Sequence, residues 1–224
     1  MMHSLPDDET LYNALLHKDS TFEGIFVAGV KTTGISCRAT CTARKPKQEN
    51  VAFITITRIL TPLGPMLAGA TDAGVCLLEF IDTKMLETQI SRLKKRLRAE
   101  FVPGSNRHFK ALHQQLQEYF AGKRKEFSLP LVMQGTPFQQ DVWKALRTIP
   151  YGETCSYQAQ AGLLGKPRAV RAVAQANGDN RISIIIPCHR VIGKDGKLVG
   201  YGGGLWRKRF LLDLEVGAPR ENTL

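Results

Sequence analysis

A cysteine and a histidine stand side by side near the end of the sequence, at Cys188 and His189. They follow Pro187 and the apolar run of residues 182–186, Ile-Ser-Ile-Ile-Ile. A short β-branched run closed by proline is typical of a buried strand, so we expect the thiol at a strand end. Burial raises the pKa of a thiol and makes it inert. Cys188 is therefore either a packed core residue or a nucleophile with its own deprotonation partner, for which His189 is the candidate.

Spacing argues against two familiar classes of cysteine enzyme. A phosphatase-type loop requires an arginine six residues after the cysteine, where this chain has Lys194. A cysteine protease needs a remote histidine with an orienting partner, and no other histidine here has such a context. Neighbouring side chains of an extended segment point to opposite faces. His189 can therefore reach Cys188 only across a turn or through a water molecule.

A glycine-rich stretch, Gly-Tyr-Gly-Gly-Gly, occupies residues 200–204. A cofactor-binding glycine loop follows a parallel strand, opens the helix of a βαβ unit and has an acid about twenty residues later. The helix that follows this stretch is nearly the end of the chain. We therefore interpret the glycines as backbone that can approach a planar ligand closely.

The composition is that of a globular protein with an acidic partner. The 224 residues carry a net charge of +11 and an isoelectric point near 9.6, which indicates a nucleic acid or an anionic membrane. The sequence has no apolar stretch of membrane-spanning length, and its start carries acids, so we expect a cytoplasmic protein without a membrane partner. Five scattered cysteines predict reduced thiols.

Residues 51–131 show strand signals followed by helix signals. Alternating patterns predict an antiparallel sheet with strands at 51–59, 66–70 and 75–80. Two amphipathic helices follow, with the apolar faces Leu86, Ile90, Leu93, Leu97 and Phe109, Leu112, Leu116, Phe120. The first helix also carries the basic residues Arg92, Lys94, Lys95, Arg96 and Arg98. These residues form either a nucleic-acid contact or a solvated outer face.

The chain beyond residue 136 has a helical pattern, interrupted by residues that typically start or end helices. Thr136 can cap a helix that has Pro137 at its first position. A short helix at 156–164 and another at 168–177, joined by a glycine turn, predict a helix-turn-helix. Its second helix carries Arg168, Ala169 and Arg171. The alanines of this helix are either simple helix formers or small residues that let its backbone press into a groove of DNA.

These features together resemble the O6-alkylguanine-DNA alkyltransferases. The resemblance covers roughly residues 56–215 and lies in the Pro-Cys-His-Arg-Val string at 187–191, in Asn180 and in the Gly-Tyr-Gly at 200–202. It implies an α/β (α+β) fold, in which a ribonuclease-H-like subdomain with an antiparallel sheet precedes a helix-turn-helix, winged-helix-like catalytic subdomain. We expect these subdomains at residues 51–131 and 132–218.

The resemblance implies a role for each residue near the cysteine. Cys188 would accept the alkyl group of a guanine that is flipped out of the DNA. His189 would polarise the thiol through a water molecule, with Glu215 behind the imidazole. Asn180 would bridge the structural elements around the site. Chemistry on a base requires that it leave the stack, which agrees with this expectation.

The resemblance also implies contacts with the DNA. Arg171 would replace the flipped base in the stack, and Tyr157 would push the backbone phosphate. Arg168 and Ala169 belong to the same DNA-binding helix as Arg171.

A third set of residues would form the substrate pocket. Tyr201 would lie near the guanine ring, with Gly202 beside it, and the carbonyls of Cys188 and Leu198 would accept from the exocyclic amine. The thioether product is stable, so we expect one turnover per molecule and no cofactor.

The expected function is therefore stoichiometric repair of O6-methylguanine, and also of O4-methylthymine, in double-stranded DNA by a monomer. Two alternatives stay open. An alkyltransferase-like lesion-binding protein lacks the cysteine, which is present here as Cys188. A methylation-sensing regulator of the Ada type needs a complete zinc site and a further DNA-binding domain.

Residues 1–50 resemble the zinc module of the adaptive-response protein Ada, but the resemblance is incomplete. That module uses a C-x3-C pair and a C-x2-C pair, and this chain has only the first, Cys37 and Cys41. Cys76 and Cys155 are distant from the pair and from each other. Tetrahedral zinc needs two further ligands. We therefore expect a remnant of the module with weak or no zinc affinity and no phosphotriester repair.

Overall fold

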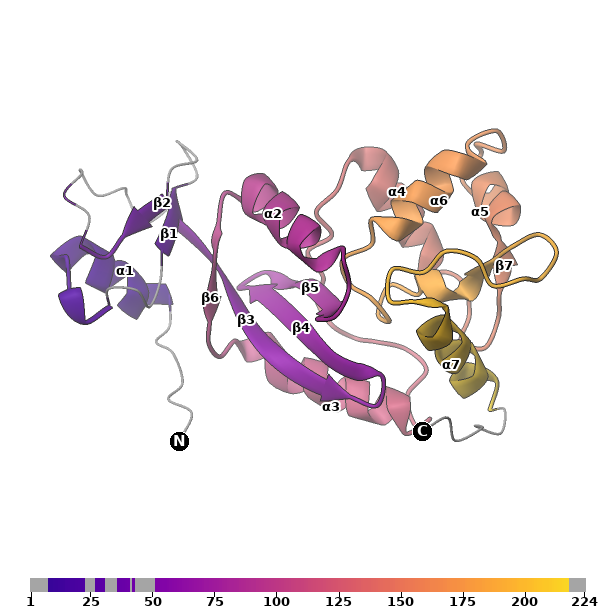
Figure 1. Ribbon diagram of the computed structural model, residues 1–224, viewed down its shortest axis with the longest axis horizontal. Coiled ribbons are helices and arrows are strands. Elements are labelled where there is room, and N and C mark those ends of the chain that lie inside the picture. Colours follow the sequence, from indigo (N-terminus) through magenta and orange to yellow (C-terminus); the bar gives the residue numbers. More distant parts are fainter. Residues whose placement is uncertain (1–7, 23–26, 31–35, 41, 43–50, 218–224) are drawn as a thin grey trace.

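The computed structural model describes residues 8–22, 27–30, 36–40, 42 and 51–217 (Figure 1). The molecule is elongated, and its parts follow one another in chain order. A small amino-terminal part lies at one end, a sheet with two helices lies in the middle, and a helical part lies at the other end. Cys41 lies outside the described residues.

The amino-terminal part contains α1 (Asp8–His17), the 3-10 helix η1 (Ser20–Phe22), β1 (Val27–Val30) and β2 (Ser36–Arg38). It has its own small core, in which Leu11 and Leu15 of α1 pack with Ala28 and Phe53. β1 pairs antiparallel with β2 and with the start of β3, so this part continues the central sheet.

The central sheet is built from β3 (Val51–Thr61), β4 (Gly64–Thr71) and β5 (Gly74–Phe80), which are antiparallel neighbours. This confirms the predicted antiparallel sheet. A further strand, β6 (Glu100–Pro103), pairs parallel with β3. Four residues are too short to show the alternation by which a strand is recognised, so the sequence analysis missed β6.

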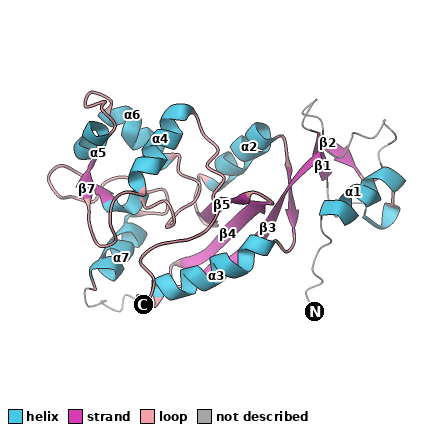
Figure 2. Cartoon of the chain, turned by 180° about the vertical axis from the view of Figure 1, so that it is seen from behind, coloured by secondary structure: helices cyan, strands magenta, loops and turns pink. Residues whose placement is uncertain are grey.

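Two helices cover opposite faces of this sheet (Figure 2). α2 (Leu86–Leu97) buries Leu93 in a cluster with Ile54 and Leu77. α3 (Arg107–Phe120) buries Leu112 and Leu116 in the main core, on the other side. Adjacent residues of a strand face opposite sides, so Leu77 packs under α2 while Leu78 belongs to the main core.

The carboxyl-terminal part is mainly helical. It contains α4 (Pro137–Leu146), β7 (Cys155–Ser156), α5 (Tyr157–Leu163), α6 (Val170–Gly178), the 3-10 helix η3 (Cys188–Arg190), β8 (Val191–Ile192) and α7 (Leu205–Val216). Thr136 and Gln139 form a complete capping box at the start of α4. The Trp143 indole donates to the Ala176 carbonyl at 2.8 Å, which fixes α4 against α6.

Two local expectations were wrong. The helix predicted at 168–177 begins only at Val170, because Pro167 and Arg168 lie in a turn and Ala169 is its N-cap. Residues 182–186 are buried but do not form a strand: only Ile182 bridges to β5, and the chain then turns, with Ile184 at a φ of 73°. A β-branched run buried on all sides carries no signal that separates a strand from a packed turn.

The central sheet and the helical part share one hydrophobic core. Leu78 of β5 donates its backbone N–H to the Arg181 carbonyl and accepts from Ser183 N–H, both at 2.8 Å. Residues from both parts form the main cluster, including Met66, Leu116, Val142, Trp143 and Leu211. The segment that leads to Cys188 is therefore fixed to the edge of the sheet. No helix in the described part of the chain is both long and apolar enough to cross a membrane.

Candidate active site

Cys188 is the first residue of the 3-10 helix η3, and its side chain is buried. The Asn180 side chain holds the turn that precedes it. Its Nδ2 donates to the Ile186 carbonyl at 2.8 Å and lies 3.3 Å from the Cys188 sulfur, while its Oδ1 accepts from Ile182 N–H at 3.0 Å. Asn180 thus ties both ends of the turn to the thiol.

The surroundings of Cys188 keep it protonated. Burial raises its pKa to about 11, and the nearby carboxylate of Glu79 acts in the same direction. The Asn180 amide and the Lys208 ammonium oppose this rise without cancelling it. The thiol therefore needs a base before it can act as a nucleophile at neutral pH.

The His189 imidazole is suited to be that base. Burial lowers its pKa below 6.5, although the hydrogen bond with Glu215 opposes the shift, so the ring is neutral at neutral pH. Its Nε2 lies 2.8 Å from Glu215 Oε1. A carboxylate only accepts hydrogen bonds, so Nε2 carries the proton and Nδ1 holds the lone pair. Nδ1 is buried and has no hydrogen-bond partner among the described residues.

Glu215, on α7, is the hub of a buried polar network. Arg190 donates Nε and Nη2 to its two oxygens at 2.9 and 3.0 Å, the Tyr119 hydroxyl donates at 2.7 Å, and Gly152 N–H donates at 3.1 Å. Burial alone would raise the pKa of Glu215, but the hydrogen bonds from His189 and Arg190 outweigh it and lower the pKa to about 2. The carboxylate therefore stays charged and holds the imidazole in one tautomer and orientation.

A buried lysine fixes the loop beside the cysteine. Lys208 Nζ donates to the carbonyls of Val191, Val199 and Gly200 at 2.6, 2.7 and 3.3 Å. The Tyr157 hydroxyl donates to the Val199 carbonyl at 3.3 Å. The strand after the 3-10 helix and the start of the glycine-rich loop are thereby joined. Leu198 is half-buried just before this junction and Gly202 is exposed just beyond it.

Polar side chains from the sheet reach the same region. The carboxylate of Glu79, in β5, is buried and accepts from Phe80 N–H at 2.9 Å and from the Ser183 hydroxyl at 3.2 Å. Burial raises the pKa of Glu79 to about 7. Burial also raises the pKa of Tyr201, and the charges of Cys188 and Glu79 raise it further. Glu79, Tyr201 and Cys188 are thus electrostatic neighbours.

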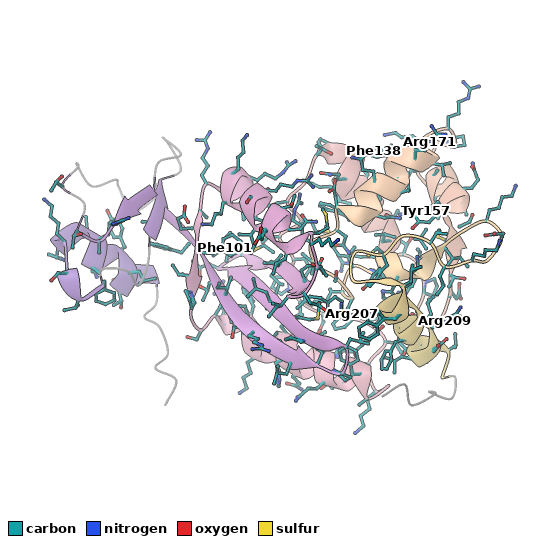
Figure 3. All side chains as sticks on the ribbon, viewed as in Figure 1. Phe101, Phe138, Tyr157, Arg171, Arg207 and Arg209 are labelled. Atoms are coloured by element: carbon teal, nitrogen blue, oxygen red, sulfur yellow. The ribbon has the colours of Figure 1, made fainter. Side chains whose placement is uncertain are left out.

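Of the residues expected to contact DNA, Arg171 lies at the outer edge of the helical part, whereas Tyr157 lies nearer the glycine-rich loop (Figure 3). Arg171 is exposed at the start of α6, and Arg168 is exposed in the turn before that helix. Ala169 is half-buried at the N-cap. Tyr157, half-buried at the start of α5, faces the glycine-rich loop through its hydroxyl. Two short helices, α5 and α6, therefore flank the site, and α6 carries the exposed side chain of Arg171.

Sequence reasoning missed Tyr119, Arg190 and Lys208. Arg190 is the neighbour of His189 in the Pro-Cys-His-Arg-Val string at 187–191, and this position was the only feature of the sequence that could have indicated a role in the site. Tyr119 is 96 residues from Glu215 in the chain, and its place on the buried face of α3 indicated core packing alone. Lys208 is a charged residue on a helix, which usually predicts exposure.

The described residues contain no tetrahedral zinc site, but Cys41 lies outside them, so the expected weak zinc affinity stays a prediction. Cys37 is in β2, whereas Cys76 is buried in β5 and Cys155 lies in β7. No group of three or more metal-ligating His, Cys, Asp or Glu side chains occurs among the described residues. In the sequence of residues 1–50 the thiols are Cys37 and Cys41, whereas a tetrahedral zinc ion requires four ligands.

Comparison with protein families assigns both main parts of the chain. Residues 54–133 match the ribonuclease-like domain of 6-O-methylguanine DNA methyltransferase, and residues 137–217 match the DNA binding domain of the same protein. Residues 10–58 match the metal binding domain of Ada, although this chain has only one of the two expected cysteine pairs.

Individual relatives agree with this assignment. A methylated-DNA–protein-cysteine methyltransferase of Methanosarcina barkeri is 47% identical over 159 residues, which is 70% of this chain and 94% of the relative. One from Mycobacterium tuberculosis is 61% identical over 111 residues, 49% of this chain and 67% of the relative.

Solved structures agree as well. The crystal structure of Mycobacterium tuberculosis OGT in complex with DNA is 44% identical, covers 74% of this chain and 95% of its own, and has a TM-score of 0.64. The O6-methylguanine-DNA methyltransferase of Pyrococcus kodakaraensis, 23% identical with a TM-score of 0.55, covers 73% of this chain and 99% of its own and shares the fold. The chain belongs to the 6-O-methylguanine DNA methyltransferase family.

Proposed function

We propose that this protein repairs DNA by moving an alkyl group from O6 of guanine to its own Cys188. The observation that carries the proposal is the arrangement of a buried thiol, the Asn180 amide and a neutral His189 held by Glu215. The names of the relatives, methylated-DNA–protein-cysteine methyltransferases, support the same reaction. The alternative of lesion binding without transfer is not favoured, because the acceptor thiol is present.

The reaction is a substitution at the alkyl carbon. The Cys188 sulfur forms a bond to that carbon while the bond from the carbon to O6 breaks, and its electron pair remains on the guanine. Because the pKa of the thiol is about 11, the proton must leave as the sulfur attacks. His189 Nδ1 receives it through a bridging water molecule, and the charged Glu215 stabilises the resulting imidazolium.

The product explains the stoichiometry. The sulfur ends in a thioether, which is not cleaved by water. The His189 imidazolium returns its proton through the bridging water to the guanine, which leaves the pocket with its base pairing restored. A thioether carbon is also not attacked by amines or carboxylates such as those of Lys208 and Glu79, so neither neighbour would regenerate the thiol. Each molecule therefore acts once, and the reaction needs no cofactor.

The two short helices α5 and α6 form the DNA-binding helix-turn-helix in this proposal. The net charge of +11 favours double-stranded DNA, and the exposed Arg171 at the start of α6 enters the stack in place of the flipped base. Arg168 and Ala169 contact the same groove, and Tyr157 contacts the backbone phosphate. The protein acts as a monomer.

The flipped base binds next to the glycine-rich loop. Tyr201 and Gly202 line the pocket, and the carbonyls of Cys188 and Leu198 accept from the exocyclic amine of guanine. O4-methylthymine presents an alkylated oxygen in a similar ring position, so it is the expected second substrate.

The test is transfer of a methyl group from an O6-methylguanine duplex, measured by the intact mass of the protein. We expect one methyl per wild-type chain and none on Cys188→Ala. Cys155→Ala is the matched control and should gain one methyl, because Cys155 lies in β7 outside the network of Asn180, His189 and Glu215. A wild-type protein that binds the lesion but gains no mass would establish the lesion-binding alternative instead.

A further inference from the structure

Arg207 is a buried cation that the proposed reaction does not use. It lies on α7, between the strand ends of the central sheet and the helical part (Figure 3). Its side chain is only 5% exposed. The guanidinium carbon stands 4.1 Å from the centre of the Phe80 ring and 4.5 Å from that of Trp206. Burying a guanidinium costs free energy, so we expect its hydrogen bonds and ring contacts to stabilise a particular arrangement of the segments around it.

The guanidinium joins three separate segments. Nε donates to the Leu63 carbonyl in the turn between β3 and β4 at 2.9 Å. Nη2 donates to the Asp82 carboxylate, just after β5, at 2.8 Å. Nη1 donates to the Gly203 carbonyl in the glycine-rich loop at 2.9 Å. Two of the partners belong to the ribonuclease-like part and the third to the loop beside the cysteine.

The position of Gly203 is coupled to that of Tyr201. A Cβ atom at Gly203 would lie 2.9 Å from the Tyr201 ring and 2.9 Å from the Phe80 ring, closer than such contacts are observed. The Gly203 backbone is therefore packed tightly against both aromatic rings. A shift of Gly203 away from Arg207 would therefore change the packing against the Tyr201 ring.

We propose that Arg207 is a positioning residue, which sets the base pocket around Tyr201 relative to the ribonuclease-like part of the molecule. The inference rests on the proposed function, because it assigns Tyr201 to the pocket for the base. It gives the ribonuclease-like part a task in the reaction: Leu63, Phe80 and Asp82 supply a fixed frame against which the loop is held. Arg207 then acts on binding of the base and not on the nucleophilicity of Cys188.

Free O6-benzylguanine separates these two effects, because it reaches the pocket without DNA binding. For Arg207→Met we expect the half-saturating base concentration to rise by at least about tenfold, as a small misplacement of a binding group commonly does. The limiting transfer rate should change less, and the rate at which iodoacetamide alkylates Cys188 should stay within about twofold. Arg207→Lys should behave like Arg207→Met, because an ammonium cannot replace the planar fork that reaches three partners.

Two control variants exclude trivial causes. Arg209→Met removes the same charge from an exposed position two residues further along α7 and should leave both parameters unchanged (Figure 3). Leu93→Ala weakens the separate core under α2 and should lower thermal stability without raising the half-saturating concentration.

If wild-type protein transfers no alkyl group, the proposed function fails before Arg207 is tested. If wild type is active and both Arg207 variants saturate like wild type, the positioning role is wrong. It is equally wrong if Leu93→Ala raises the half-saturating concentration as much as Arg207→Met does, because general destabilisation then explains the effect. Should Arg207→Met fail to fold, Arg207→Lys gives the same decision.

Discussion

Glu79 is a buried carboxyl whose charge state should affect the site. Burial raises its pKa to about 7 in the folded protein, from an ordinary value of 4.5. Between these two pH values the folded state holds a proton that the unfolded state has lost. The free energy of unfolding therefore falls as pH rises from 4.5 through 7 on account of this group. Above pH 7 the folded protein carries a buried negative charge near Cys188.

Glu79→Gln should remove this penalty. We expect the variant to resemble wild type at pH 5 and to be more stable at pH 8 by on the order of 1–3 kcal/mol, as measured by urea unfolding. Iodoacetamide should also alkylate Cys188 faster at pH 8. The reason is that the uncharged amide of Glu79→Gln, unlike the Glu79 carboxylate, does not raise the pKa of the thiol. Glu87→Gln, on the exposed side of α2, is the matched control. Equal stability differences at the two pH values would contradict the raised pKa of Glu79.

At the scale of residues, the sequence could indicate the reacting pair and its neighbours Asn180 and Glu215, but not the side chains that hold these groups in place. Cys188 and His189 are adjacent in the chain, and the Pro-Cys-His-Arg-Val string that contains them is specific to the alkyltransferase family. Tyr119, Lys208 and Glu79 act through partners that are 96, 17 and 104 residues away in the chain. Side-chain contacts over such separations depend on how the sheet and the helices pack, which a local pattern does not contain.

At the scale of elements, α6 should affect the rate of alkyl transfer from DNA but not the rate of transfer from a free base. Arg171→Ala removes the exposed group expected to fill the gap that a flipped base leaves. We expect transfer from an O6-methylguanine duplex to slow by roughly tenfold or more, corresponding to a stacking contribution of about 1–3 kcal/mol. Transfer from free O6-benzylguanine should be unchanged. If both reactions slow equally, α6 acts on the site itself and not on the DNA.

Elements with strong periodicity were predicted well. The strands β3, β4 and β5 alternate, α2 and α3 have clear apolar faces, and α4 has a capping box at Thr136. Residues 182–186 were assigned wrongly to a strand, because a run buried on all sides has no periodicity to read. The start of α6 was misplaced because Pro167, a frequent first residue of helices, here lies in the preceding turn.

At the scale of the whole molecule, the amino-terminal part should behave as a remnant of a metal-binding domain. The chain offers Cys37 and Cys41 but no second cysteine pair. We therefore expect metal analysis of the purified full chain to find well under one zinc per molecule. The protein should also take up no methyl group from DNA that carries only methyl phosphotriesters. One zinc per chain after dialysis would show that other ligands complete the site.

The main parts of the molecule work as one unit. The carboxylate that orients His189 is held in turn by Tyr119 of the ribonuclease-like part, and the turn before Cys188 is bridged to β5. Both the buried network and the base pocket therefore depend on contacts across the shared core. This is why the site could not be assembled from the carboxyl-terminal motifs alone.

Cys188 accepts one alkyl group and acts once in the proposed reaction. The most direct test is to incubate the full chain with excess O6-methylguanine duplex and to map the modified peptide by mass spectrometry. We expect a plateau at one methyl per chain, with the methyl on Cys188 and with Cys76 and Cys155 unmodified. Repair that continues beyond one lesion per chain, or a methyl found on any other residue, would contradict it.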